Sequence, residues 1–142
     1  MRRNKLSLFL HPVWATWDRL PLITADIERR LYRQLESEAR KLECSVLAIG
    51  GIEDHLHMLV SIPATICIAD LVKQLKGVSS HFVNQEFQLG TQFKWQGSYG
   101  AFTVSRWDTA KLITYINQQK EHHESNTQIF EYEQAFEEVS SN

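Results

Sequence analysis

The chain has 142 residues, of which 43% are hydrophobic and 23% are charged, and its formal net charge is −2. This length and composition fit a single globular domain over residues 1–142 and suggest neither a disordered chain nor a membrane protein. No apolar run reaches the roughly 20 residues of a membrane-spanning helix, so we expect a cytoplasmic protein with no membrane partner.

The first half of the chain predicts a strand, a helix and a hairpin. Residues 6–17, "LSLFLHPVWATW", have the aromatic and β-branched content of a strand. Thr24 is suited to cap a helix that continues to about Leu42, because apolar residues recur there at helical spacing. Two further strands follow at residues 44–50 and around residues 55–62, and we expect them to pair as a hairpin.

The second half predicts two helices separated by one strand. Residues 68–87 repeat apolar residues at helical spacing, and residues 93–105, "FKWQGSYGAFTVS", read as a strand or a bent ribbon. Asp108 is suited to cap a third helix through about His123. The order β, α, β, β, α, β, α predicts an α+β fold of the ferredoxin-like (RRM-like) split βαβ type, with an antiparallel sheet and an extra C-terminal helix.

Two histidines stand one residue apart in the stretch "EDHLHMLV", residues 53–60. Side chains alternate along a strand, so His55 and His57 point to one face while Leu56 and Met58 point to the other. Two interpretations remain open. The imidazoles converge on a bound ligand, or they are partly exposed side chains on the polar face of an amphipathic strand.

The third predicted helix reads "LITYINQQKEHH" and carries a tyrosine and a glutamine on one face. Tyr115 and Gln119 are four residues apart. If this face packs over the strand of His55 and His57, a hydroxyl, an amide oxygen and two imidazoles share one pocket. A divalent metal there, Mn²⁺ or Mg²⁺, would polarise a phosphodiester, and attack by the Tyr115 hydroxyl would give a covalent phosphotyrosine.

The stretches "HLH", "LKGVSSHFVN", "FKWQGSYGAFTVS" and "YINQQ" follow one another in this order. Together they resemble the HUH-type, single-tyrosine transposases of the insertion sequence 200/605 group, which include the REP-associated tyrosine transposases. The resemblance runs from about residue 7 to about residue 136. It implies a DNA transposase, a strand transferase that cleaves and rejoins single-stranded DNA at ends flanked by hairpins, with the 5′ phosphate held on tyrosine.

The resemblance also assigns roles to individual residues. It implies that His55 and His57 are metal ligands, that Tyr115 is the catalytic nucleophile, and that Gln119 completes the metal site. Gln118 is the neighbouring candidate, which helix geometry directs less well. The implied assembly is a homodimer in which the tyrosine helix of one subunit can complete the site of the other.

The charge distribution leaves DNA binding open despite the negative net charge. Residues 124–142, which we expect to form an acidic C-terminal tail, carry five acidic residues and no basic one. Five basic residues of the predicted helices are candidates for phosphate contacts, which add salt-sensitive affinity: Arg29, Arg30, Arg33, Lys73 and Lys76. The alternative for each of them is that it belongs to a solvent-exposed helix face and has no DNA contact.

Two other functions compete with the strand transferase. The first is a non-catalytic or domesticated DNA-hairpin-binding protein of the same fold, from which only an activity measurement separates the transferase. The second is a metal-dependent hydrolase of small phosphate esters in which Tyr115 has only a structural role.

Overall fold

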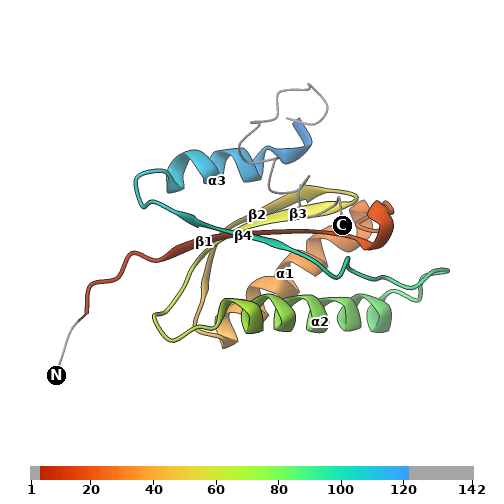
Figure 1. Ribbon diagram of the computed structural model, residues 1–142. Coiled ribbons are helices and arrows are strands. Elements are labelled where there is room, and N and C mark those ends of the chain that lie inside the picture. The colour runs from red at the N-terminus through yellow and green to blue at the C-terminus, as the bar shows by residue number, and fades with distance from the viewer. Residues whose placement is uncertain (1–3, 122–142) are drawn as a thin grey trace.

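The computed structural model describes residues 4–121, so the acidic tail expected from about residue 124 lies outside the described residues (Figure 1). No helix within residues 4–121 is both long and apolar enough to cross a membrane. The elements are, in chain order, β1 (Phe9–Ala15), the 3₁₀ turn η1 (Trp17–Arg19), α1 (Ala25–Lys41), β2 (Ser45–Ile52), β3 (His55–Ser61), α2 (Ile68–Glu86), β4 (Gly100–Val104) and α3 (Thr109–Asn117).

The four strands form one antiparallel sheet in the order β2-β3-β1-β4. Helices α1 and α2 cover one face of this sheet, and α3 lies across the other (Figure 1). This arrangement confirms the predicted ferredoxin-like split βαβ fold with an extra helix at the C-terminal side. On its face of the sheet, α3 packs against β2 and β3, and β3, inside the sheet, is buried along almost its whole length.

The apolar stripe predicted for α1 faces the main core. Ile27, Leu31, Leu35 and Ala39 are buried against the sheet and α2. Thr24 occupies the predicted N-cap position, but its hydroxyl donates to the carboxylate of Asp26 and makes no capping bond to a backbone N–H. The burial of the stripe therefore stabilises this helix without a side-chain cap.

The alternation predicted for the "HLH" strand is confirmed. Leu56, Met58 and Val60 enter the main core under α1 and α2. By the same alternation the two histidines belong to the opposite face, where the ring of His57 contacts Tyr115 of α3. The interpretation of His55 and His57 as partly exposed polar side chains is wrong, because both are fully buried.

Several predicted boundaries differ from the structure. The first strand begins at Phe9, three residues later than predicted. Only Gly100–Val104 of the aromatic stretch joins the sheet as a strand. Helix α3 ends at Asn117, before the predicted end at His123, which lies outside the described residues. The backbone N–H of Gln118 bonds to carbonyls both three and four residues back, a pattern common where helices end.

The rest of the aromatic stretch is held against α2 by side-chain hydrogen bonds. Asn84 donates to the backbone carbonyl of Phe93 (2.9 Å) and accepts from its N–H (2.8 Å). The indole N–H of Trp95 donates to the Ser79 hydroxyl (2.9 Å). Because the Phe93 and Trp95 rings are both buried in the main core, this segment is part of the packed domain although it is not a regular strand.

We expect Asn84→Ala to lower the free energy of unfolding by about 1–3 kcal/mol, because it leaves two backbone polar groups of a buried residue without their partner. Urea unfolding followed by circular dichroism measures this loss. Gln85→Ala, on the exposed side of the same helix, is the matched control and should change stability by less than about 0.5 kcal/mol. Equal stability of the two variants would contradict the role given to Asn84.

Candidate functional site

The two histidines of β3 lie side by side under α3. The ring centroids of His55 and His57 are 5.2 Å apart and the rings are nearly perpendicular, at 72°. Their strand pairs with β1, where Ala15 and Val13 are their respective partners. The Nε2 atoms of both rings are buried. The sheet therefore places two imidazoles together on one face, in an environment shielded from water.

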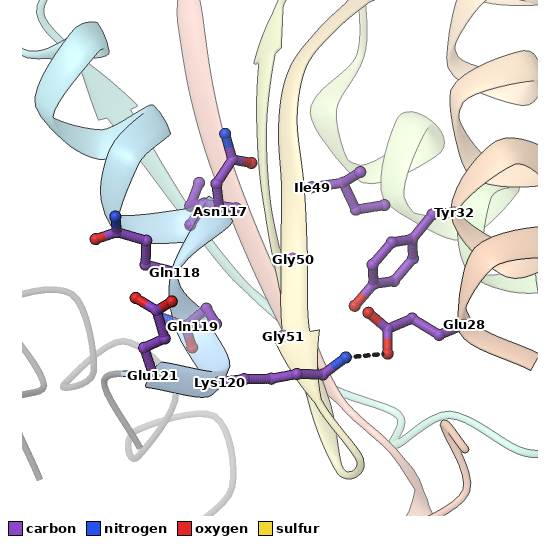
Figure 2. Close-up of a pocket in the computed structure, with 11 residues that line it drawn as sticks. Glu28, Tyr32, Ile49, Gly50, Gly51, Asn117, Gln118, Gln119, Lys120 and Glu121 are labelled. Carbon is purple, nitrogen blue, oxygen red and sulfur yellow. Dashed lines mark hydrogen bonds and ion pairs between the residues drawn. The ribbon is translucent and has the colours of Figure 1, made fainter. Parts of the chain in front are cut away.

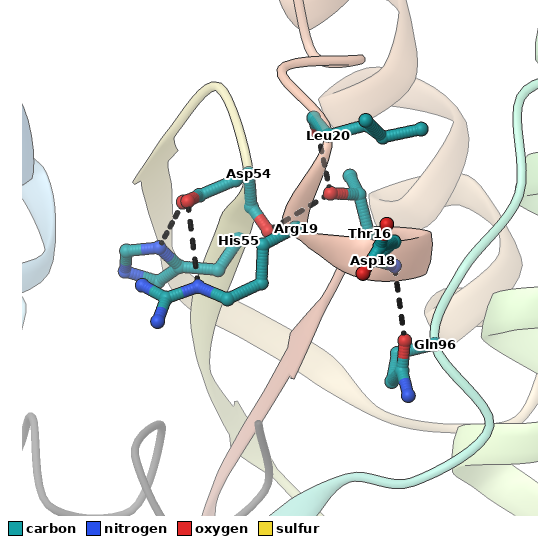
Figure 3. A network of polar contacts seen from close by, with 7 residues as sticks. All are labelled: Thr16, Asp18, Arg19, Leu20, Asp54, His55 and Gln96. Carbon is teal, nitrogen blue, oxygen red and sulfur yellow. Dashed lines mark hydrogen bonds and ion pairs between the residues drawn. The ribbon is translucent and has the colours of Figure 1, made fainter. Parts of the chain in front are cut away.

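A carboxylate fixes the orientation of the first histidine (Figure 3). The Nδ1 atom of His55 lies 2.9 Å from a carboxylate oxygen of Asp54, and the other oxygen of Asp54 lies 3.6 Å from Nε of Arg19. Sequence reasoning missed both partners. Asp54 could have been found because it directly precedes the histidine motif, whereas no local pattern points to Arg19.

The turn that carries Arg19 has an unusual backbone. Asp18 and Arg19 both have φ of 53°, in the left-handed region that costs a residue with a side chain roughly 1–2 kcal/mol. Buried Thr16 holds the turn, because its hydroxyl donates to the carbonyl of Leu20 (2.6 Å) and its N–H donates to the carbonyl of Asp54 (2.9 Å). Tertiary contacts thus stabilise the conformation that brings Arg19 to Asp54.

A third histidine contacts the second one. Nε2 of His11, on β1, lies 2.9 Å from Nδ1 of His57, and the two rings are stacked with an interplanar angle of 26°. His11 is buried, and burial lowers its pKa from the usual 6.5 to about 4, so this imidazole is neutral at physiological pH. Sequence reasoning did not single out His11, although strand alternation from its position would have placed it on the α3 side of β1.

Helix α3 brings the tyrosine to the histidine pair. The ring of Tyr115 is 2% exposed and stands at 89° to the ring of His57, with centroids 6.3 Å apart. Gln119 is buried one turn further along, whereas Gln118 is exposed. Gln119 is therefore buried although it lies two residues beyond the end of α3 at Asn117, so the helical repeat alone does not account for its position.

The close approach of α3 to the sheet depends on a glycine of β2. A Cβ atom on Gly50 would lie 2.2 Å from the backbone carbonyl oxygen of Ile116. Any side chain there would collide with the helix backbone. Gly50, the last residue of the second predicted strand, therefore has a packing function: it lets the backbone of α3 rest directly on the strand beside the histidines.

A pocket of about 290 Å³ opens beside this contact, between α3, β2 and α1 (Figure 2). Gln119 lines it, whereas Tyr115 and the histidine pair do not. Lys120 crosses the edge of β2 to pair with Glu28 on α1. Burial and the negative charge of Glu28 raise the pKa of the Tyr32 hydroxyl. The pocket thus lies next to the site, and the ion pair between Lys120 and Glu28 links the chain that follows α3 to α1.

Comparison with known proteins decides the family. Residues 4–119 match the sequence model of the family described as transposase IS200 like. The chain is a member of the IS200-like transposase family. The matched range contains both histidines, the tyrosine and Gln119, so the whole candidate site lies within it.

Individual relatives agree with this assignment. The ISDra2 transposase TnpA of Deinococcus radiodurans is 28% identical over an alignment of 121 positions, and the match covers 80% of this chain and 84% of that protein. A crystal structure of a protein described as a transposase from Deinococcus radiodurans R1 shares 26% identity with a TM-score of 0.66, covering 84% of this chain and 96% of the other.

A further solved structure supports the fold alone. It is that of a REP-associated tyrosine transposase bound to a REP hairpin, and it superposes with a TM-score of 0.64 at 13% identity. The match covers 87% of this chain and 74% of the other. The overall fold is therefore similar to that of this protein.

The donor atoms of this transposase suit a divalent metal ion. No group of three or more His, Cys, Asp or Glu side chains within residues 4–121 is arranged to hold a metal, but the expected donors, two imidazoles and an amide oxygen, are a different kind of set. The Nδ1 atoms of His55 and His57 already contact Asp54 and His11, so Nε2 is the nitrogen of each ring that suits a metal. Imidazole and amide donors fit Mn²⁺ or a similar divalent ion.

The basic residues predicted to bind DNA lie on the other side of the sheet from Tyr115. Arg29, Arg30 and Arg33 belong to α1, and Lys73 and Lys76 belong to α2. These helices cover the face opposite α3 (Figure 1). Contacts between these residues and DNA would therefore involve a surface remote from the tyrosine, and their role in binding stays a prediction.

Two of these basic side chains also have contacts within the protein. Arg30 pairs with Glu86 at 3.1 Å. The Nζ atom of Lys76 donates to the backbone carbonyls of Gln96 (2.5 Å) and Ser98 (3.2 Å), and burial lowers its pKa. Lys76 therefore helps to fasten the aromatic stretch to α2, a structural role that its sequence position did not indicate.

Proposed function

We propose that this transposase cleaves and rejoins single-stranded DNA at hairpin-flanked ends through a 5′-phosphotyrosine intermediate formed on Tyr115. The observation that carries the proposal is the meeting of the Tyr115 and His57 rings, 6.3 Å apart, in a family of DNA transposases. A phenol that lies beside two imidazoles on one sheet face suits phosphoryl transfer to a hydroxyl better than it suits a structural core.

The proposed reaction exchanges one phosphoester bond for another. In cleavage, the Tyr115 oxygen bonds to phosphorus, the bond to the 3′ oxygen breaks, and the released 3′ hydroxyl takes up a proton in place of the one that the phenol loses. The 5′ phosphate remains on the tyrosine. In rejoining, a 3′ hydroxyl attacks the phosphotyrosine and the phenol leaves. Because one bond forms for each bond broken, the reaction needs no ATP.

We propose that His55 and His57, through Nε2, and Gln119, through its amide oxygen, would hold the divalent metal ion, Mg²⁺ or Mn²⁺. Bound there, the ion would supply Lewis acidity and neutralise charge that builds on the phosphate in the transition state. The buried surroundings strengthen this electrostatic effect. Because Tyr115 is 2% exposed, attack on DNA requires the site to open.

The partner we propose is single-stranded DNA that carries a hairpin, and a REP hairpin is what the related tyrosine transposase of known structure binds. The basic side chains of α1 and α2 would contact its phosphates. We also propose a homodimer acting in the cytoplasm, in which α3 can be exchanged between subunits. In the single chain, Tyr115 already meets the His57 of its own sheet.

The experiment that tests the function incubates the protein with single-stranded oligonucleotides taken from the DNA that flanks its gene, with Mn²⁺, Mg²⁺ or a chelator. Denaturing gels then detect covalent protein–DNA adduct. We expect adduct with metal and none with chelator. Tight hairpin binding without adduct would favour the non-catalytic binding protein. Turnover of a generic phosphodiester without adduct would favour the small-ester hydrolase.

A further inference from the structure

His11, on β1, contacts His57, the second proposed metal ligand, and can determine which ring nitrogen of His57 carries the proton. Val13 is the partner of His57 across the β1–β3 pair, so His11, two residues earlier, is its diagonal neighbour on the same face. Nε2 of His11 and Nδ1 of His57 are 2.9 Å apart, and the ring centroids are 5.2 Å apart. Both side chains are buried, so water does not compete freely for this contact.

A hydrogen bond between two neutral imidazoles can be made in two ways, and only one suits metal binding. If His57 donates from Nδ1, its Nε2 carries a lone pair that can bind a cation. If His11 donates instead, the proton of His57 must sit on Nε2, and that atom cannot be a ligand. The tautomer of His11 therefore decides whether Nε2 of His57 is a donor or an acceptor.

We propose that His11 is a positioning residue that accepts the Nδ1–H of His57 and thereby keeps the Nε2 lone pair of His57 directed to the metal. This inference rests on the proposed function, and it extends it to a residue that does not touch the metal or the DNA. Outer partners of this kind fix both the tautomer and the ring angle of a metal-binding histidine.

The two proposed metal ligands, His55 and His57, would then be held in place by different kinds of hydrogen-bond partner. Asp54, the partner of His55, is a partly exposed carboxylate that also pairs with Arg19. His11 is a buried imidazole that is only 3% exposed. The partner of His57 is therefore another imidazole, whereas the partner of His55 is a carboxylate that belongs to an ion pair. Stacking against His11 also restricts rotation of the His57 ring.

Two substitutions of His11 separate positioning from packing. His11→Leu removes the acceptor but keeps an apolar side chain in the buried position, whereas His11→Gln keeps an acceptor oxygen. Calorimetric titration with Mn²⁺ alone should show about 10- to 100-fold weaker binding for His11→Leu and recovery of most of the affinity in His11→Gln. His81→Leu, at an exposed histidine of α2, is the control and should bind Mn²⁺ as the wild type does.

Long-range ¹H–¹⁵N spectra of the metal-free protein give the second measurement. We expect His57 to be protonated at Nδ1 in the wild type and in His11→Gln, and to shift toward the Nε2-protonated form in His11→Leu. Urea unfolding of each variant checks that it is folded. Unchanged Mn²⁺ affinity together with an unchanged His57 tautomer in folded His11→Leu would overturn the inference, as would weaker binding that His11→Gln fails to restore.

The inference and the proposed function can fail separately. Wild-type protein that binds no Mn²⁺ and forms no adduct would contradict the proposed function. The tautomer of His57 in the metal-free variants would still decide whether His11 sets its proton, and an unchanged tautomer in His11→Leu would then overturn the inference by itself.

Discussion

Tyr115→Phe is expected to abolish the covalent adduct while the protein stays folded and still binds the hairpin. The phenol oxygen is the proposed nucleophile, and loss of a covalent nucleophile lowers a rate by a factor on the order of 10⁶ in a well-studied case. The phenyl ring still fills its place in the small cluster with Leu59, Leu112 and Ile116. Denaturing gels measure adduct, and native gel shifts measure hairpin binding.

Tyr99→Phe is the matched control, because Tyr99 lies 36% exposed in the segment before β4. It should form adduct at the rate of the wild type. If Tyr115→Phe formed adduct, another residue would have to be the nucleophile, and the assignment of Tyr115 would be wrong. If the variant lost hairpin binding as well, the tyrosine would be needed for DNA binding, contrary to the proposed separation of the two surfaces.

The same variant tests whether the site is shared between subunits. Tyr115→Phe protein supplies an intact histidine pair, and His57→Ala protein supplies an intact tyrosine. In the structure, Tyr115 contacts His57 of its own chain. If each site is built from one chain only, each protein in the mixture still lacks one of the two residues, and no adduct forms. Adduct formation in the mixture would show that α3 is exchanged between subunits of the proposed homodimer.

Gly50→Ala is expected to reduce both stability and activity. The new methyl group would lie 2.2 Å from the carbonyl oxygen of Ile116, and because that atom belongs to the helix backbone, α3 must shift away from β2. Overpacking of this kind costs about 1–3 kcal/mol in unfolding free energy. Tyr115 precedes Ile116 directly, so the shift also moves the nucleophile, and a displacement of 1 Å can lower a rate by about 100-fold.

Gly77→Ala is the control, and we expect it to change the free energy of unfolding in the opposite direction. Gly77 lies inside α2, and a Cβ atom there would meet nothing within 4 Å. Replacing a helix-interior glycine with alanine should raise the free energy of unfolding by about 0.5–1 kcal/mol. Urea unfolding and the adduct assay compare the two variants. A Gly50→Ala protein as stable and as active as the wild type would show that α3 does not depend on this close approach.

The order of elements could be predicted from the sequence, but several of their ends could not. Periodicity identifies α1 and α2 because burial of one helical face depends mainly on local spacing. The segment 93–98 is different, since its aromatic residues suit a strand while its partners are side chains of α2. The end of α3 at Asn117 also lacks a Gly or Pro signal in the sequence.

By itself, the sequence determined those parts of the site that depend on the geometry of one element. His55 and His57 share a face because strand side chains alternate. This relation holds whatever the rest of the chain does, so it could be predicted without knowledge of the packing. The helical repeat also predicts that Gln119 shares the face of Tyr115, but α3 ends at Asn117, so the burial of Gln119 depends on the chain beyond this helix.

Only the tertiary structure decided what surrounds these residues. His11 and His57 are 46 residues apart in sequence and meet through the pairing register of β1 and β3. Arg19 reaches Asp54 through a turn with left-handed backbone that tertiary contacts hold in place. Strand register and the approach of α3 to β2 arise from packing of the whole domain. Local patterns do not encode them, because the free energy that selects them comes from contacts between distant segments.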